Sequence, residues 1–241
     1  MKIQGKGHIF KRFDNEMDHL HTLVMDMGSL AIEQLASAAE TLASKDPAKA
    51  HQVIANDEKL NDLDVQADDE IIRIIALRAP MARDLREIIA VSKIVAELER
   101  AGDEARKIAG LTIRFYDNDE RPPSGGILDD IFSLTEFVSM MLSDSMEALD
   151  DLDLDLAIKI LGQGIKLDEK LQSSLRHLST YIMEDSRNVG HFVDIVLGIR
   201  ALERFGGHAK NIAGHIVFLT KGIDVRHEDT ESVIQKVNAE G

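Results

Sequence analysis

Five oxygen-bearing side chains at helical spacing are the residues of this 241-residue chain best suited to chemistry. Asp57, Asn61 and Asp64 follow one another at steps of four and three, which places them on one face of a helix. Glu99 and Asp103 are four residues apart, so their carboxylates stack one helical turn above the other. Two antiparallel helices that present such oxygens to each other can hold Mg²⁺, Mn²⁺ or an iron ion. The sequence therefore predicts a metal site formed by these five residues.

The position of two of these carboxylates strengthens the prediction. Asp57 and Asp64 interrupt an apolar stripe that continues at the same spacing through Val53, Leu60 and Ala67. An ionised carboxylate on such a stripe is destabilising unless it is paired or binds a cation. The alternative is an acidic helix face in contact with water, where such spacing has no special role. Both interpretations are open at this point.

One segment of the chain occurs twice. Residues 98–110 recur as residues 202–214, with eight of the thirteen positions identical. The interval between the copies is long enough to hold several helices, which indicates duplication of a domain-sized unit. The repeat includes Gly102 and Gly206, each in the middle of a predicted helix, where glycine is about 1 kcal/mol less favourable than alanine. We expect these glycines to allow a close helix contact or to leave room for a ligand.

The positions of proline, glycine and short polar clusters divide the chain into helical stretches. The linker at 117–126, which contains two prolines and two glycines, lies near the middle. Three helices are predicted on each side of it, near 14–44, 47–78, 80–116, 127–150, 153–186 and 188–221. The third has a clear apolar seam, formed by Val91, Ile94, Leu98, Ala101, Ala105 and Ile108. The sequence thus indicates an all-α protein.

Composition excludes several classes of protein. The net charge of −15 disfavours binding to nucleic acid and favours cations and basic protein surfaces. The chain has no cysteine, which excludes thiolate metal sites, and no apolar run near the roughly 20 residues that cross a bilayer. We expect a soluble, cytoplasmic protein. A phosphate-binding loop and a nucleophile elbow are absent, and Glu16 with His19 is the only Glu-x-x-His pair, so redox catalysis at a di-iron site is disfavoured.

Several motifs resemble those of the PhoU family of phosphate-transport accessory and signalling proteins. They are residues 96–103 and their second copy, residues 13–16, residues 78–80 followed by 84–86, and residues 221–227. The resemblance covers about residues 8–228. It implies a fold of two tandem, similar three-helix bundles. These would span residues 8–117 and 127–221, followed by a polar tail at 222–241.

The resemblance also implies a function. Such proteins act in the cytoplasm as non-enzymatic adaptors between the phosphate ABC transporter and the phosphate-sensing histidine kinase, and they repress the phosphate-starvation response. It further implies a homodimer that reaches the membrane only through its partners, without a catalytic cofactor. The alternatives are an accessory regulator of another phosphate permease and a metal-dependent enzyme built in a helical bundle.

Family members bind metal through motifs of the form Glu/Asp-x-x-x-Asp, which Glu99 and Asp103 match and which Asp57 and Asn61 resemble. The second copy departs from this pattern. Asp168 stands as the counterpart of Asp57 and Glu203 as that of Glu99, whereas Leu175 and Gly207 replace the other carboxylates. We therefore predict that metal binds mainly in the first repeat, with Asp168 and Glu203 as a weaker second site.

Overall fold

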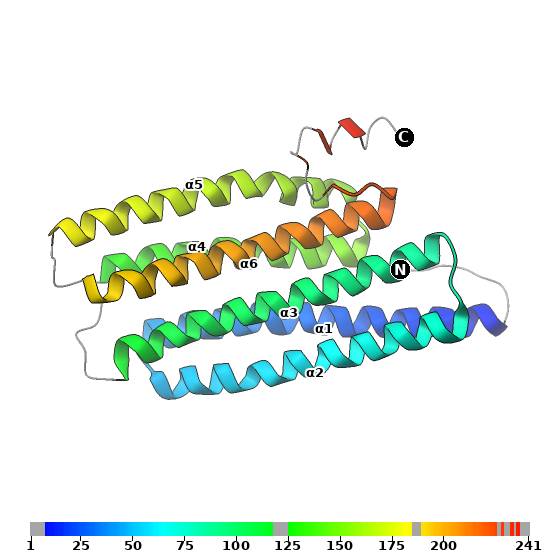
Figure 1. Ribbon diagram of the computed structural model, residues 1–241, viewed down its shortest axis with the longest axis horizontal. Coiled ribbons are helices and arrows are strands. Elements are labelled where there is room, and N and C mark those ends of the chain that lie inside the picture. The colour runs from blue at the N-terminus through cyan, green and yellow to red at the C-terminus, as the bar shows by residue number, and fades with distance from the viewer. Residues whose placement is uncertain are drawn as a thin grey trace.

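The computed structural model describes residues 8–117, 125–184 and 189–225, together with residues 228, 232–233 and 235–236. Within these residues the chain forms long α-helices and no strand (Figure 1), which confirms the all-α prediction. The helices are α1 (His8–Ser44), α2 (Pro47–Arg78), α3 (Arg83–Tyr116), α4 (Gly125–Asp151), α5 (Leu154–Glu184) and α6 (Val189–Lys221). The predicted boundaries agree closely except that α1 begins at His8. Parts of the predicted linker and of the motif at 221–227 lie outside the described residues.

Short polar residues fix the helix ends. Asp46 caps α2, because its side chain accepts a hydrogen bond of 3.0 Å from the backbone N–H of Lys49, and Pro47 occupies the first helical position. Asp153 caps α5 in the same way through Leu156 at 2.9 Å. The helix α2 ends at Arg78, and the next residue, Ala79, adopts the left-handed conformation before Pro80. The two aspartates therefore set where α2 and α5 start.

The apolar seams form one continuous core. All six residues of the seam predicted on α3 are buried, so that prediction is confirmed. On α2 the buried stripe contains six apolar side chains and one carboxylate, that of Asp57. Burial of this apolar surface supplies the main driving force for packing, at roughly 25 cal/mol per Å².

The helices assemble as two three-helix bundles that lie side by side, α1–α3 in one and α4–α6 in the other (Figure 1), which confirms the predicted tandem architecture. The bundles meet where α3 packs against α6 and where α1 packs against α4. Among the described residues, no helix is both long and apolar enough to span a membrane. Since α3 contacts α1, α2 and α6, its acidic residues lie near both its own bundle and the second one.

Candidate functional site: an acidic cluster on α2 and α3

Asp57 is the most deeply buried of the predicted metal ligands, with 3% of its surface exposed. Two side chains hold its carboxylate. Gln34 of α1 donates a hydrogen bond of 2.8 Å from Nε2 to Oδ1, and Nη1 of Arg106 lies 3.4 Å from Oδ2. The same guanidinium donates a 2.7 Å hydrogen bond from Nη2 to Oδ1 of Asp103. Arg106 therefore bridges Asp57 on α2 and Asp103 on α3.

Two further carboxylates belong to the same cluster. Glu99 and Asp64 are both partly buried. Burial raises the pKa of Glu99, and the negative charges of Asp103, Asp64 and Asp57 raise it further. Burial likewise raises the pKa of Asp64, with a contribution from Asp68. The structure thus brings four of the five predicted ligands into one electrostatic neighbourhood, while Asn61 is exposed on α2.

Gly102 explains how α3 approaches α2 so closely at this level. A β-carbon at Gly102 would overlap Leu60 of α2 and would lie 3.2 Å from Gln34 Oε1 and 3.5 Å from Asp57 Oδ1. Only a glycine therefore lets the α3 backbone pack against Leu60 beside the buried carboxylate. Of the two roles expected for the repeated glycines, close helix contact is confirmed.

The donor set suits a hard divalent cation, since it consists of carboxylate and amide oxygens. One of these oxygens, Oε1 of Gln34, is buried beside Asp57 and accepts no hydrogen bond from any described residue. Within the described part of the chain, however, no three His, Asp or Glu side chains converge closely enough to hold a metal ion. Asp57 and Asp103 are instead directed at Arg106. The residues fit a cation in chemistry, and the metal site stays a prediction.

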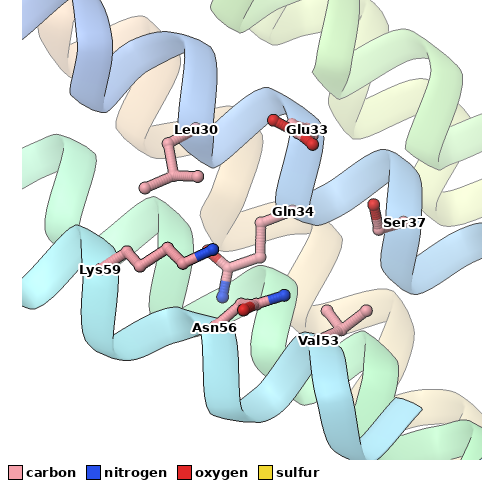
Figure 2. Close-up of a pocket in the computed structure, with 7 residues that line it drawn as sticks. All are labelled: Leu30, Glu33, Gln34, Ser37, Val53, Asn56 and Lys59. Carbon is pink, nitrogen blue, oxygen red and sulfur yellow. The ribbon is translucent and has the colours of Figure 1, made fainter. Parts of the chain in front are cut away.

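A pocket of about 110 Å³ lies between α1 and α2 on the other side of Gln34. Figure 2 shows Gln34 reaching from α1 toward α2, where Asn56 and Lys59 lie, with Ser37 one turn further along α1. The Gln34 side chain stands between this pocket and Asp57, to which its Nε2 is bonded. The buried carboxylate is therefore approached from α1 through Gln34 and from α3 through Arg106.

The second repeat has the same framework with different side chains. A β-carbon at Gly206 would lie 2.5 Å from Leu167 and 3.0 Å from Val138. Because Gly102 lies over Leu60 and Gln34 in the same manner, Leu167 corresponds to Leu60 and Val138 to Gln34. This register makes Gly164 the counterpart of Asp57 and Leu171 that of Asp64. The sequence predicts Asp168 as the counterpart of Asp57. That assignment is wrong, because in this register Asp168 corresponds to Asn61.

The predicted ligands of the second repeat are not brought together in a comparable cluster. Asp168 is exposed, and Glu203 pairs with Arg200 on its own helix at 2.5 Å. A β-carbon at Gly164 would lie 3.3 Å from Nζ of Lys210, the counterpart of Arg106. In the first repeat the carboxylate of Asp57 lies against the guanidinium of Arg106. In the second repeat Lys210 lies against Gly164, which has no side chain. This difference supports the predicted asymmetry between the repeats.

Two acidic residues of α3 hold the repeats together, and the sequence did not single them out. Glu104 accepts two hydrogen bonds of 2.8 Å from Arg204 of α6. Glu97 lies 2.6 Å from Nδ1 of His208 and accepts a 3.2 Å hydrogen bond from Asn211. Glu97 and Glu104 are seven residues apart and buried, so both lie on the α6-facing side of α3. The sequence did not show that these two carboxylates are buried, and their burial is what marks them as part of the interface between the repeats.

Other residues of the site were also missed by the sequence-based prediction, and only some of them could have been inferred from the sequence. Arg106 follows Asp103 by three residues, and that spacing commonly forms an ion pair on a helix. Gln34 gave no such signal, because its partner Asp57 lies on another helix. Glu16 and Arg78, both in motifs of the sequence, pair through two hydrogen bonds of 2.8 Å and join the start of α1 to the end of α2.

The family model described as "PhoU domain" matches residues 24–112 and again residues 131–216. The phosphate-specific transport system accessory protein PhoU homolog of Pseudomonas putida is 36% identical over 220 residues, which cover 91% of this chain and 85% of that protein. The phosphate-specific transport system accessory protein PhoU of Escherichia coli is 35% identical over 220 residues, with 91% and 90% covered. The two matches to the family model fall one in each three-helix bundle.

Solved structures similar to this chain are named as members of the same family. The crystal structure of PhoU from Pseudomonas aeruginosa superimposes with a TM-score of 0.81 at 34% identity and covers 88% of this chain and all of that one. The phosphate transport system regulatory protein PhoU from Streptococcus pneumoniae gives a TM-score of 0.79 at 25% identity over 88% of this chain. The fold and the site define a duplicated helical-bundle protein with an acidic, oxygen-rich cluster in its first copy. The chain belongs to the PhoU family.

Proposed function

We propose that this protein regulates phosphate uptake and phosphate-starvation signalling as a non-enzymatic adaptor between the phosphate ABC transporter and its sensor histidine kinase. The observation that carries the proposal is the extent of the similarity. It spans 91% of this chain and 90% of an Escherichia coli relative named as a phosphate-specific transport system accessory protein. Both repeats are therefore included. In this role the protein represses the starvation response when phosphate is plentiful.

The charge of the chain suits such an adaptor. A net charge of −15 favours docking on basic, cytoplasm-facing protein surfaces, with electrostatic attraction speeding the encounter. The protein acts in the cytoplasm as a homodimer and reaches the membrane through the transporter. Its binding to the transporter complex should weaken as salt rises beyond about 0.1 M, where the Debye length falls below ~10 Å. Binding that does not change with salt would point to an apolar interface instead.

A deletion strain tests the regulatory role directly. Without the protein, phosphate-starvation genes should stay expressed in high phosphate, and the wild-type gene supplied in trans should restore repression. Purification of the tagged protein from membranes should also recover the transporter ATPase and the sensor kinase. Normal repression in the deletion strain would exclude the signalling role. Copurification with a different phosphate permease would favour the second candidate, an accessory regulator of that permease.

We also propose that the carboxylate cluster of the first repeat binds a divalent cation. Two observations support this. The pKa of Glu99 is raised by its burial and by three neighbouring carboxylates, a repulsion that a bound cation would relieve. The buried Oε1 of Gln34 accepts no hydrogen bond from the described residues and lies beside Asp57. The oxygen donors of the cluster would bind Mg²⁺, Mn²⁺ or an iron ion.

A further inference from the structure

Arg106 holds a special position within the acidic cluster. Its two terminal nitrogens engage two carboxylates on different helices, Asp103 at 2.7 Å and Asp57 at 3.4 Å. The Arg106 side chain is 43% exposed, whereas that of Asp57 is 5% exposed. Asp57 is also fixed from the far side by the hydrogen bond from Gln34. Arg106 is therefore the partner that can move into water, while the buried carboxylate stays in place.

We propose that the guanidinium of Arg106 competes with a divalent cation for Asp57 and Asp103, so that binding of the metal requires displacement of Arg106. This inference rests on the cation site proposed above and goes beyond it, because it assigns the control of affinity to one residue. Asp103 Oδ1 accepts a hydrogen bond from Arg106, and Asp57 Oδ2 lies 3.4 Å from the same guanidinium, so Arg106 occupies the side of both oxygens from which a metal ion would bind. Because arginine stays charged at all ordinary pH values, the competition does not depend on its deprotonation.

The charges around Arg106 support a competition rather than a permanent replacement. Arg106 contacts Asp57 and Asp103 and, among the described residues, forms no ion pair with Glu99 or Asp64. The carboxylates of Asp57, Asp64 and Asp103 lie close enough to Glu99 for their negative charges to act on it. A single positive charge thus leaves excess negative charge at the cluster. A divalent cation would neutralise more of it.

Arg100 provides a matched control for charge. It lies on α3 and its positive charge also acts on Glu99, but its nearest acidic partner is Glu97 at 3.8 Å. Arg106→Gln and Arg100→Gln therefore remove the same charge near the same cluster, and only the first removes the contacts with Asp57 and Asp103. A third variant, Arg106→Lys, keeps the charge but not the two-pronged guanidinium.

The test is a titration of each full-length protein with Mn²⁺, followed by the loss of the free-ion electron paramagnetic resonance signal. We expect Arg106→Gln to bind Mn²⁺ about tenfold more tightly than wild type, Arg106→Lys to be intermediate, and Arg100→Gln to stay within about twofold. Thermal melts of the metal-free proteins should show that Arg106→Gln is folded, with a larger Mn²⁺-induced rise in Tm than wild type.

Each contrary result is specific. An equal gain in affinity from Arg106→Gln and Arg100→Gln would show that only long-range charge matters and would overturn the competition. An unchanged or weaker affinity in Arg106→Gln would also overturn it, while Mn²⁺ binding by the wild type would leave the cation site standing. If neither the wild type nor Arg106→Gln binds Mn²⁺ at millimolar concentration, the cation site and the competition both fail. If Arg106→Gln does not fold, a wild-type affinity in Arg106→Lys would count against the proposal.

Discussion

Arg204 of α6 donates two hydrogen bonds of 2.8 Å to the carboxylate of Glu104 on α3, and so joins the second repeat to the first. Glu104 is 5% exposed, and Lys107 donates a third hydrogen bond to it at 2.8 Å. Burial raises the pKa of Glu104, but the hydrogen bonds from Arg204 and Lys107 outweigh burial and leave the pKa lowered. The carboxylate is therefore charged and fully engaged at the interface between the bundles.

Arg204→Met should lower the free energy of unfolding by about 1–2 kcal/mol at pH 7. The value lies above that of an exposed pair because Glu104 is buried, and below that of a fully buried pair because the Arg204 side chain is half exposed. Urea denaturation measures the loss. Because the folded-state pKa of Glu104 is lowered, its stabilisation is present above the unfolded pKa of about 4.5 and disappears as pH falls through the folded value. The difference between variant and wild type should shrink accordingly in acid.

Arg200→Met is the control for this interface. Arg200 pairs with Glu203, three residues away on the same helix, and both side chains are substantially exposed. The control should change stability by less than about 0.5 kcal/mol. An equal loss in both variants would mean that Arg204 contributes through general surface charge and not through the joint between the repeats.

The sequence predicted the helices and the duplication well, because both depend on local patterns. The caps at Asp46 and Asp153 and the apolar seams are read along the chain. The sequence also predicted the carboxylate cluster, because helical spacing places Asp57 and Asp64 on one helix face and Glu99 and Asp103 on another. Whether two such faces meet depends on how antiparallel helices are aligned, and here they meet.

The residues that pair with these carboxylates were harder to predict from the sequence. The Gln34–Asp57 contact joins helices whose mutual register is set by packing. The register of α5 was misread for a related reason. Leu167 lies beneath Gly206, as Leu60 lies beneath Gly102, although the two leucines are 107 residues apart and the two glycines 104. The connection before the middle helix has two residues in both repeats, so the three extra residues belong to α4, which ends at Asp151 and not at residue 148, the equivalent of Ser44. An alignment anchored on α3 and α6 therefore does not carry over to the middle helix.

Two adjacent glycines of α6 should respond in opposite directions to the same change. A β-carbon at Gly206 would lie 2.5 Å from Leu167 and 3.0 Å from Val138, both buried, so Gly206→Ala should destabilise the protein by about 1–3 kcal/mol. A β-carbon at Gly207 would meet no atom of the described residues within 4 Å, and Gly207→Ala should stabilise the helix by up to about 1 kcal/mol. Thermal melts of the pair decide this. Stabilisation by both changes would show that the α5–α6 contact relaxes easily.

The acidic cluster should make metal binding asymmetric. Glu99→Ala combined with Asp103→Ala should remove most bound divalent metal, whereas Glu203→Ala should change it little. The reason is that the second repeat places Gly164 and Leu171 where Asp57 and Asp64 lie, and affinity for such ions follows the number and charge of the ligands. Elemental analysis measures the bound metal, and melts with and without metal measure its effect on stability. Equal loss from both variants, or metal retained by the double variant, would exclude an asymmetric site.

Glu87 should make the protein less stable as pH rises. This α3 residue is 4% exposed and lines a small, mainly apolar cavity, together with Val91 and Leu149. Burial raises its pKa to about 7, Arg83 opposes the rise and Asp84 adds to it. Between the unfolded pKa of about 4.5 and the folded value, the folded state holds more protons than the unfolded state. Stability therefore falls over this range and stays low above it.

Glu87→Gln removes this titration. Its stability relative to wild type should increase by up to about 3 kcal/mol between pH 5 and pH 8, at 1.36 kcal/mol per pKa unit. Urea denaturation of both proteins at several pH values measures the change, with Glu136→Gln, a substitution of an exposed carboxylate on α4, as the control. Parallel pH profiles for wild type and Glu87→Gln would mean that Glu87 ionises normally in the folded protein. If Glu87 is a buried carboxylic acid, the stability of Glu87→Gln relative to wild type should be constant at low pH and should rise as the pH increases above about 5.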